Sequence, residues 1–315
     1  MSNIIRDIAH LAHVEMYTPH LDASTRFFVE IMGMSVSDTK GDSVYLRAYD
    51  DYEHHTLKLT AHKTNGIGHY AWRTVSTEAL DRRVDAIKKS GNGIGWNEGD
   101  LGHGKAYMFK MPDGHLVEIY FDTVKYKAGE QDKSALKNTV SKFPGRGINV
   151  RRIDHLNLLA KDVVAFRDFQ MNVIGGRLTE TIIFDNNDVK GVWFSVNSKS
   201  YELAVTQDHS GMNARLHHIT YAVNSREEVL IAADICLENG IFIETGPHKH
   251  AVQQTFFLYV YEPGGNRVEI CNPTARLILD PDYETIVWSK EERAKGQAWG
   301  LQTVSSFHTR GTPEK

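Results

Sequence analysis

The sequence predicts an α+β protein of four βαβββ modules, arranged as two tandem domains that arose by duplication. The prediction rests on segments of the first half that recur in the second, and on the order of strand-like and helix-like patterns inside each segment. A polar stretch with Pro144, Gly145 and Gly147 separates the halves, as a linker would. The expected parts are an N-terminal domain (1–123), a linker (124–150), a C-terminal domain (151–272) and a tail (273–315).

Three pairs of segments carry the repeat. HVEMYTPHLDASTRFFVEIMGM, which begins at His13, matches HLNLLAKDVVAFRDFQMNVIGG, which begins at His155, at an offset of 142 residues. GHYAW matches HHITY at an offset of 149, and MPDGHLVEIY matches EPGGNRVEIC at 151. The offset grows only in small steps, as loop insertions would make it, so the chain is interpreted as a duplication.

The first module shows the pattern of each unit. His13–Tyr17 alternates like a strand, and Leu21–Met32 places its apolar residues at helical spacing. Gly33 stands where such a helix would end. Ser43–Ala48 and Thr56–Thr60 read as two of the short strands that follow.

The other three modules repeat this order. Each has one helical stripe of apolar residues: Leu80, Val84 and Ile87 in the second, Val163, Phe166 and Phe169 in the third, and Val229, Ala233 and Cys236 in the fourth. Helices on one side of such strands indicate α+β domains. The tail lies outside the repeat, and its Trp288 and Trp299 are expected to pack on the domain before it.

Composition excludes several classes of function. With 36 Lys and Arg against 40 Asp and Glu, the chain has no basic excess to attract nucleic acid. No apolar run reaches the roughly 18 residues that a membrane helix needs, and the N-terminal residues do not resemble a signal peptide. The only cysteines are Cys236 and Cys271, which favours a reducing compartment. We therefore expect a cytoplasmic protein with no nucleic-acid or membrane partner.

Histidine is the unusual residue, with 16 copies. His155, His218 and Glu269 fall at corresponding points of repeated units, so they can converge inside one curved sheet. Two imidazoles and one carboxylate are the ligands of the facial triad of non-haem Fe(II) enzymes. Two ordinary buried histidines and a surface glutamate would account for the residue types alone. His217 is expected to point to the other face of its strand, because side chains alternate.

Nearly the whole chain resembles the vicinal oxygen chelate superfamily, which has the glyoxalase-like fold, and within it the type I extradiol ring-cleaving dioxygenases. The segments RRIDHLN and RLHHITY match the two histidine strands of that family. The most specific match is HAVQQTFFLYVYEPGGNRVE, whose residues fill the family signature in order: His250, Leu258, Tyr259, Glu262, Pro263, Gly265 and Glu269. Other stretches look most like the catechol and homoprotocatechuate 2,3-dioxygenases.

The resemblance implies an Fe(II) enzyme, with Mn(II) as the alternative metal, that opens a catechol with O2 to a 2-hydroxymuconic semialdehyde. It assigns the metal to His155, His218 and Glu269. It also implies a homotetramer. Two rival functions stay open: a metal-dependent lyase or isomerase of the glyoxalase type, and a non-enzymatic ligand-binding protein.

The resemblance also assigns residues around the metal. Asn157 and Trp193 match residues that line the substrate pocket, and His250 and Tyr259 match a pair that hydrogen-bonds the diol. Tyr201 stands where the family has a histidine on the oxygen side of the metal. A phenol with a pKa near 10 donates a hydrogen bond but accepts a proton poorly. Tyr201 is therefore expected to act as a donor only.

Homoprotocatechuate enzymes carry arginines that hold the carboxylate of their substrate. At those places this chain has Thr245, Lys295 and Gly296. Thr carries no charge and Lys does not reproduce the bidentate fork of Arg. We therefore expect an uncharged catechol as the substrate.

The N-terminal half repeats the triad as His13, His69 and Glu118. The positions that correspond to His250 and Tyr259 hold Gly99 and Met108, which cannot bind or deprotonate a catechol. The N-terminal domain is therefore expected to be non-catalytic. Its triad is interpreted as a remnant of the duplication, with a second metal site as the alternative that the residue types leave open.

Overall fold

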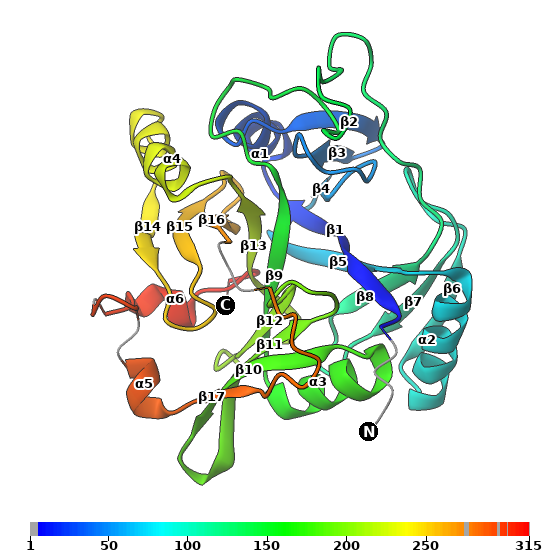
Figure 1. Ribbon diagram of the computed structural model, residues 1–315, viewed down its shortest axis with the longest axis vertical. Coiled ribbons are helices and arrows are strands. Elements are labelled where there is room, and N and C mark those ends of the chain that lie inside the picture. Colours follow the sequence, from blue (N-terminus) through cyan, green and yellow to red (C-terminus); the bar gives the residue numbers. More distant parts are fainter. Residues whose placement is uncertain (1–5, 274–276, 295–296, 301, 315) are drawn as a thin grey trace.

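The computed structural model describes residues 6–273, 277–294, 297–300 and 302–314. It contains two large β-sheets, one from each half of the chain, with helices packed on them (Figure 1). The order strand, helix and three strands occurs four times. The prediction of an α+β fold of four βαβββ modules in two tandem domains is confirmed.

The N-terminal sheet has eight strands: β1 (Ile8–Thr18), β2 (Ser35–Lys40), β3 (Ser43–Arg47), β4 (Leu57–Ala61), β5 (Gly66–Thr74), β6 (Gly93–Asn97), β7 (Ala106–Lys110) and β8 (Leu116–Tyr120). Their spatial order is β2-β3-β4-β1-β5-β8-β7-β6. The first strand of each module pairs in parallel with the last strand of the same module. The two modules meet where β1 and β5 pair antiparallel, so the first strands of both modules lie at the centre of the sheet.

The C-terminal sheet repeats this arrangement with β9 (Arg152–Ala160), β10 (Arg177–Phe184), β11 (Asp188–Ser195), β12 (Leu203–Gln207), β13 (Arg215–Ala222), β14 (Ile243–Lys249), β15 (Phe256–Tyr261) and β16 (Arg267–Asn272). Their order is β14-β15-β16-β13-β9-β12-β11-β10. The tail adds β17 (Ile286–Trp288), which pairs in parallel with β10 and extends the sheet by one strand.

The helices bury the apolar stripes that the sequence predicts. Helix α1 (Leu21–Arg26) continues as a π-helical turn (Phe27–Ile31), and α3 (Val163–Phe169) continues in the same way through Gln170–Ile174. The second and fourth modules contribute α2 (Thr77–Ser90) and α4 (Arg226–Glu238), each with a serine at its N-cap whose side chain accepts a backbone hydrogen bond. Short helices α5 (Lys290–Ala294) and α6 (Ser305–Thr309) belong to the tail.

One hydrophobic cluster runs through both halves and includes Phe28 and Ile87 from the first half and Phe166 and Val229 from the second.

The residues of the predicted linker, 124–150, are all described and contain no helix or strand. The predicted domain limits and the homotetramer stay predictions. Among the described residues, no helix has the length and apolarity to cross a bilayer.

Candidate active site

Three neighbouring strands bring the predicted metal ligands together. His155 lies on β9, His218 on β13 and Glu269 on β16, and these strands are adjacent in the order β16-β13-β9. His155 and Glu269 both stand opposite Thr220, one on each side of β13. Residues that stand opposite one another on paired strands share a face of the sheet. The predicted ligand side chains therefore converge on one face of the sheet.

The ligand atoms of this triad form a close cluster. The Nε2 atoms of His155 and His218 lie 2.9 and 3.2 Å from Glu269 Oε2, and 3.4 Å from each other. Ligand atoms bound at about 2.0–2.2 Å to one metal ion stand roughly 3 Å apart. All three side chains are at most 2% exposed. The donor set and its spacing therefore fit one divalent transition-metal ion.

Outer partners orient both imidazoles with Nε2 toward the cluster. His155 Nδ1 donates to Asp154 Oδ1 at 2.8 Å. His217 Nε2 donates to the Phe307 carbonyl at 2.8 Å, so His217 Nδ1 carries a lone pair that accepts hydrogen bonds from His218 Nδ1 at 2.6 Å and from Arg267 Nη1 at 3.3 Å. Each ligand ring is thereby left with a lone pair on Nε2, which is the arrangement that metal-binding histidines need.

The position of His217 corrects the sequence prediction, which placed it on the other face of the strand. A β-bulge lies between Leu216 and His218 in the pairing of β13 with β9. The bulge inserts one extra residue, so the alternation of side chains is broken at this point. His217 therefore lies beside His218 and lines the same pocket.

Burial and neighbouring charges fix the protonation of the triad. Burial raises the pKa of Glu269, but His155 and His218 outweigh burial and hold that pKa well below its usual range. Burial lowers the pKa of His218 to about 4. Burial also disfavours a charged His155, yet Glu269 and Asp154 raise its pKa. The site therefore presents an ionised carboxylate and a neutral His218, as a cation requires.

Thr220 is a site residue that sequence reasoning missed. Its hydroxyl donates to Glu269 Oε2 at 2.7 Å and lies 2.9 Å from His155 Nε2. The repeat gave no signal for it, because Ala71 stands at the corresponding position of the first half. The other oxygen of Glu269, Oε1, is buried without a hydrogen-bond partner among the described residues. That oxygen is available to a bound ion.

All the predicted pocket residues come together above this triad. One pocket is lined by Asn157, Trp193, Tyr201, His250 and Tyr259, together with the two ligand histidines. Glu269 is fully buried beneath it. Asn157 Oδ1 is buried and has no hydrogen-bond partner among the described residues, so it can accept one from a ligand.

His250 and Tyr259 form the predicted pair. His250 Nε2 lies 2.9 Å from the Tyr259 hydroxyl, and the imidazole stacks on Phe257 at a ring-centre distance of 3.8 Å. Burial lowers the pKa of His250 to about 4 and raises that of Tyr259 well above 10. Both groups are therefore neutral near pH 7, and His250 can accept a proton.

Tyr201 lies against the metal side of the pocket. Its hydroxyl is 3.2 Å from His155 Nε2 and 3.1 Å from Thr255 Oγ1. Burial raises the pKa of Tyr201 well above 10. The phenol keeps its proton near neutral pH, in keeping with the predicted role of a donor.

The tail closes the pocket, which the sequence did not reveal because the tail lies outside the repeat. Phe307, on α6, packs its ring 5.0 Å from Tyr259 and 4.8 Å from His217, measured between ring centres. Trp288 Nε1 donates to Glu180 at 2.7 Å, so Trp288 docks on β10 as expected. Trp299 is 60% exposed, so it packs only partly, against Phe256 and His248.

The structure describes only one of the three positions at which homoprotocatechuate enzymes have arginines for the substrate carboxylate. Thr245 lies on β14 and is not among the residues that line the pocket. Lys295 and Gly296 lie outside the described residues. Arg293, two positions earlier, does line the pocket, and its guanidinium donates to His308 Nδ1 at 2.9 Å.

Comparison with known proteins agrees with this architecture. The family model described as "Glyoxalase/Bleomycin resistance protein/Dioxygenase superfamily" matches residues 10–119 and 152–270. A metapyrocatechase of Geobacillus stearothermophilus is 42% identical over 98% of this chain and 95% of its own length. A manganese-dependent 2,3-dihydroxybiphenyl 1,2-dioxygenase of Geobacillus genomosp. 3 is 39% identical over 93% of this chain and 94% of its own length.

Solved structures show the same likeness. Homoprotocatechuate 2,3-dioxygenase of Brevibacterium fuscum, in complex with 3,4-dihydroxyphenylacetate, superposes with a TM-score of 0.86 at 26% identity, over 97% of this chain and 92% of the other. Each matched region covers most of one of the two sheets, and the second region contains the three predicted metal ligands. The chain therefore belongs to the Glyoxalase/Bleomycin resistance protein/Dioxygenase superfamily and, within it, to the extradiol ring-cleaving dioxygenases.

Proposed function

We propose that this chain opens the ring of a catechol next to its diol with O2, using Fe(II) held by His155, His218 and Glu269. The observation that carries the proposal is the pocket above the triad, where His250, Tyr259 and Tyr201 face the ligand atoms. Fe(II), when bound, would bring the diol and dioxygen together and carry electrons between them. The relatives named as metapyrocatechases support the choice of a catechol.

The residues of the chain bind the diol and move its proton. Tyr259 and the neutral His250 are placed as a hydrogen-bonded pair on one wall, where His250 Nε2 accepts a proton from the incoming diol. Asn157 Oδ1 offers an acceptor without another partner. The rings of Trp193 and Phe307, with Ile182, bound the apolar side of the pocket. The substrate is thereby held between an apolar wall and the ligand atoms.

Tyr201 delivers a proton rather than removing one. Its hydroxyl keeps its hydrogen near neutral pH and reaches the side of His155 Nε2. A histidine at this place could both release and take up a proton near neutral pH, whereas a neutral phenol takes up a proton poorly. The acid and base roles are therefore divided between Tyr201 and His250.

The identity of the bound metal ion is a separate part of the proposal. The family relatives include a manganese-dependent enzyme, and a triad of two imidazoles and a carboxylate accepts both Fe(II) and Mn(II). We propose Fe(II) as the native ion. Metal analysis of chain purified from its native host, without added metal, decides between the two.

Anaerobic loading tests the proposed reaction. Chain stripped of metal is loaded with Fe(II) or Mn(II) without oxygen, mixed with catechol and then exposed to air. We expect a yellow ring-fission product and uptake of one O2 per catechol. A lyase or isomerase of the glyoxalase type would turn over a thioester or adduct substrate without oxygen. A binding protein would retain catechol unchanged, and either result would refute the dioxygenase.

The substrate preference is testable with two diols. Among the described residues that line the pocket, Arg293 is the only Lys or Arg, and its guanidinium already contacts His308. A buried carboxylate without a partner costs several kcal/mol. We expect kcat/KM for catechol to exceed that for 3,4-dihydroxyphenylacetate by about tenfold or more, since tenfold corresponds to only ~1.4 kcal/mol.

Arg293→Met is the matched variant for this comparison, because it keeps a long side chain and removes the charge. It should widen the gap between the two diols. If the unmodified chain instead prefers the acid, and Arg293→Met abolishes that preference, Arg293 is the partner of the substrate carboxylate and the uncharged substrate is wrong.

A further inference from the structure

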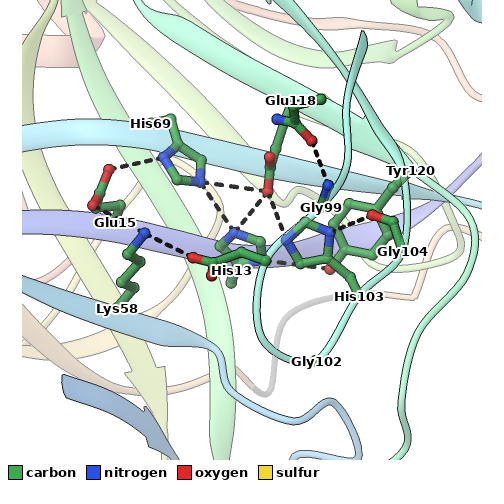
Figure 2. Close-up of polar contacts among 12 residues, drawn as sticks. His13, Glu15, Lys58, His69, Gly99, Gly102, His103, Gly104, Glu118 and Tyr120 are labelled. Atoms are coloured by element: carbon green, nitrogen blue, oxygen red, sulfur yellow. Dashed lines mark hydrogen bonds and ion pairs between the residues drawn. The ribbon is translucent and has the colours of Figure 1, made fainter. Parts of the chain in front are cut away.

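The N-terminal sheet holds a second cluster of ligand-type side chains, built on the same three strand positions as the active site (Figure 2). His13 lies on β1, His69 on β5 and Glu118 on β8. Glu118 Oε1 lies 3.0 Å from His13 Nε2 and 3.4 Å from His69 Nε2, and the two nitrogens are 3.2 Å apart. The cluster is as tight as the catalytic one.

A fourth side chain, which the repeat did not indicate, completes this cluster. His103 comes from the loop between β6 and β7, and its Nε2 lies 3.3 Å from Glu118 Oε1. Its ring stacks on Tyr120 at a ring-centre distance of 4.3 Å. Three imidazole nitrogens therefore surround one carboxylate oxygen, whereas the active site has two.

The loop is shaped to bring His103 inward. Gly102 has a φ of +86°, and a Cβ at this position would lie 2.3 Å from the Cβ of His54. Glycine is therefore required here on both conformational and steric grounds. The side chain of His103 is only 2% exposed, although the residue belongs to a loop.

Outer partners again fix each ring with Nε2 toward the cluster (Figure 2). His69 Nδ1 donates to Glu15 Oε2 at 2.9 Å, and His103 Nδ1 donates to the Gly104 carbonyl at 2.9 Å. His13 Nδ1 lies 3.3 Å from the Tyr120 hydroxyl. A carboxylate or carbonyl oxygen only accepts, so Nε2 of His69 and of His103 presents a lone pair.

Two buried atoms of the cluster have no hydrogen-bond partner among the described residues. They are His103 Nε2 and Glu118 Oε1, and both point into the cluster. In the active site a threonine hydroxyl donates to the glutamate, but its counterpart here, Ala71, has no hydroxyl. Buried polar atoms left unpaired in this way are costly, and a bound cation would satisfy both of them.

We propose that His13, His69, His103 and Glu118 bind a second divalent ion of the zinc class, which stabilises the N-terminal domain and takes no part in catalysis. Four protein ligands from nitrogen and oxygen donors are typical of a closed, tetrahedral site, whereas a catalytic site keeps one position open. With His103 as the fourth ligand, a tetrahedral ion here would keep no coordination position open for a substrate. Gly99 and Met108 replace the residues that would bind a diol.

Counting bound ions tests the proposal. Untagged full-length chain is stripped with a chelator, reloaded with Zn²⁺, desalted and analysed for metal by mass spectrometry. The unmodified chain should hold two ions, and Glu269→Gln, which damages only the active site, should hold one. Glu118→Gln and His103→Gln should each lose the N-terminal ion, and Glu269→Gln combined with His103→Gln should hold none. His20→Gln, which changes an exposed histidine, should still hold two.

Cobalt gives a second readout that needs no activity. Co²⁺ in the Glu269→Gln chain should show the intense visible absorption of a tetrahedral ion, and adding His103→Gln should remove it. Glu15→Gln keeps all four proposed ligands but removes the charge that orients His69 and pairs with Lys58, and it should weaken zinc binding at this site about 10- to 100-fold.

The proposal is overturned if the Glu269→Gln chain binds no ion, which would mean that protons alone hold the cluster together. This result stands even if Glu118→Gln fails to fold, because the Glu269→Gln chain keeps the whole N-terminal cluster. Zinc at the N-terminal cluster together with Fe(II) at the active site, but without cleavage of catechol in air, would instead refute only the proposed function.

Discussion

Glu269→Gln is expected to abolish ring cleavage and to remove one bound metal ion per chain. The substitution preserves size but replaces the anionic donor that lies within 3.2 Å of both ligand imidazoles. Loss of an outer partner typically costs 10–100-fold in metal affinity or activity, and loss of a direct ligand should cost more than ~100-fold. Turnover of catechol and metal content are measured on the same preparation.

The control for this variant is Glu238→Gln, the same chemical change at an exposed position near the end of α4. It should match the unmodified chain in both measurements. Full metal content and full turnover in Glu269→Gln would show that the triad is assigned wrongly.

His250→Phe is expected to lower kcat/KM for catechol by about 10²–10⁴-fold, the usual contribution of a general acid or base. Phenylalanine can keep the stacking on Phe257, so the loss reports the ring nitrogen rather than the packing. Tyr201→Phe should be milder and should mainly slow the steps after oxygen arrives. Stopped-flow mixing of the anaerobic chain–catechol complex with oxygen separates these steps.

Two results would reverse these roles. If Tyr201→Phe prevents catechol from binding before oxygen is present, Tyr201 acts on the substrate side. If His250→Phe binds and deprotonates catechol normally, His250 is not the base. Tyr201→His, which restores the residue usual in the family, should keep or raise the rate.

The fold could be predicted because the duplication makes the sequence pattern of each module occur twice in the chain. Where polar residues interrupt the apolar pattern of a helix in one half, the corresponding helix in the other half supports the prediction. Helix α3 is supported in this way by α1. The same logic predicted the triad, since His155 and Glu269 have counterparts in His13 and Glu118. The repeat thus supplied the long-range information that a single sequence normally lacks.

Residues without a counterpart could not be predicted in this way. His217 reaches the site because a β-bulge shifts the strand register by one residue. The alternation of residue types in the sequence does not indicate this bulge. Thr220 is matched by an alanine, His103 comes from a loop, and Phe307 comes from the tail. Each of them reaches its site by tertiary packing rather than by local pattern.

The bonds between the tail and β13 determine when the active site can be completed during synthesis. Leu216 and Thr312 exchange two backbone hydrogen bonds of 2.8 Å, and the carbonyl that orients His217 belongs to a residue 90 positions further along the chain. The strand that carries His218 therefore leaves the ribosome well before its partner does, while the N-terminal sheet can already fold. The contact that orients His217, and through it His218, can therefore form only after the tail has been translated.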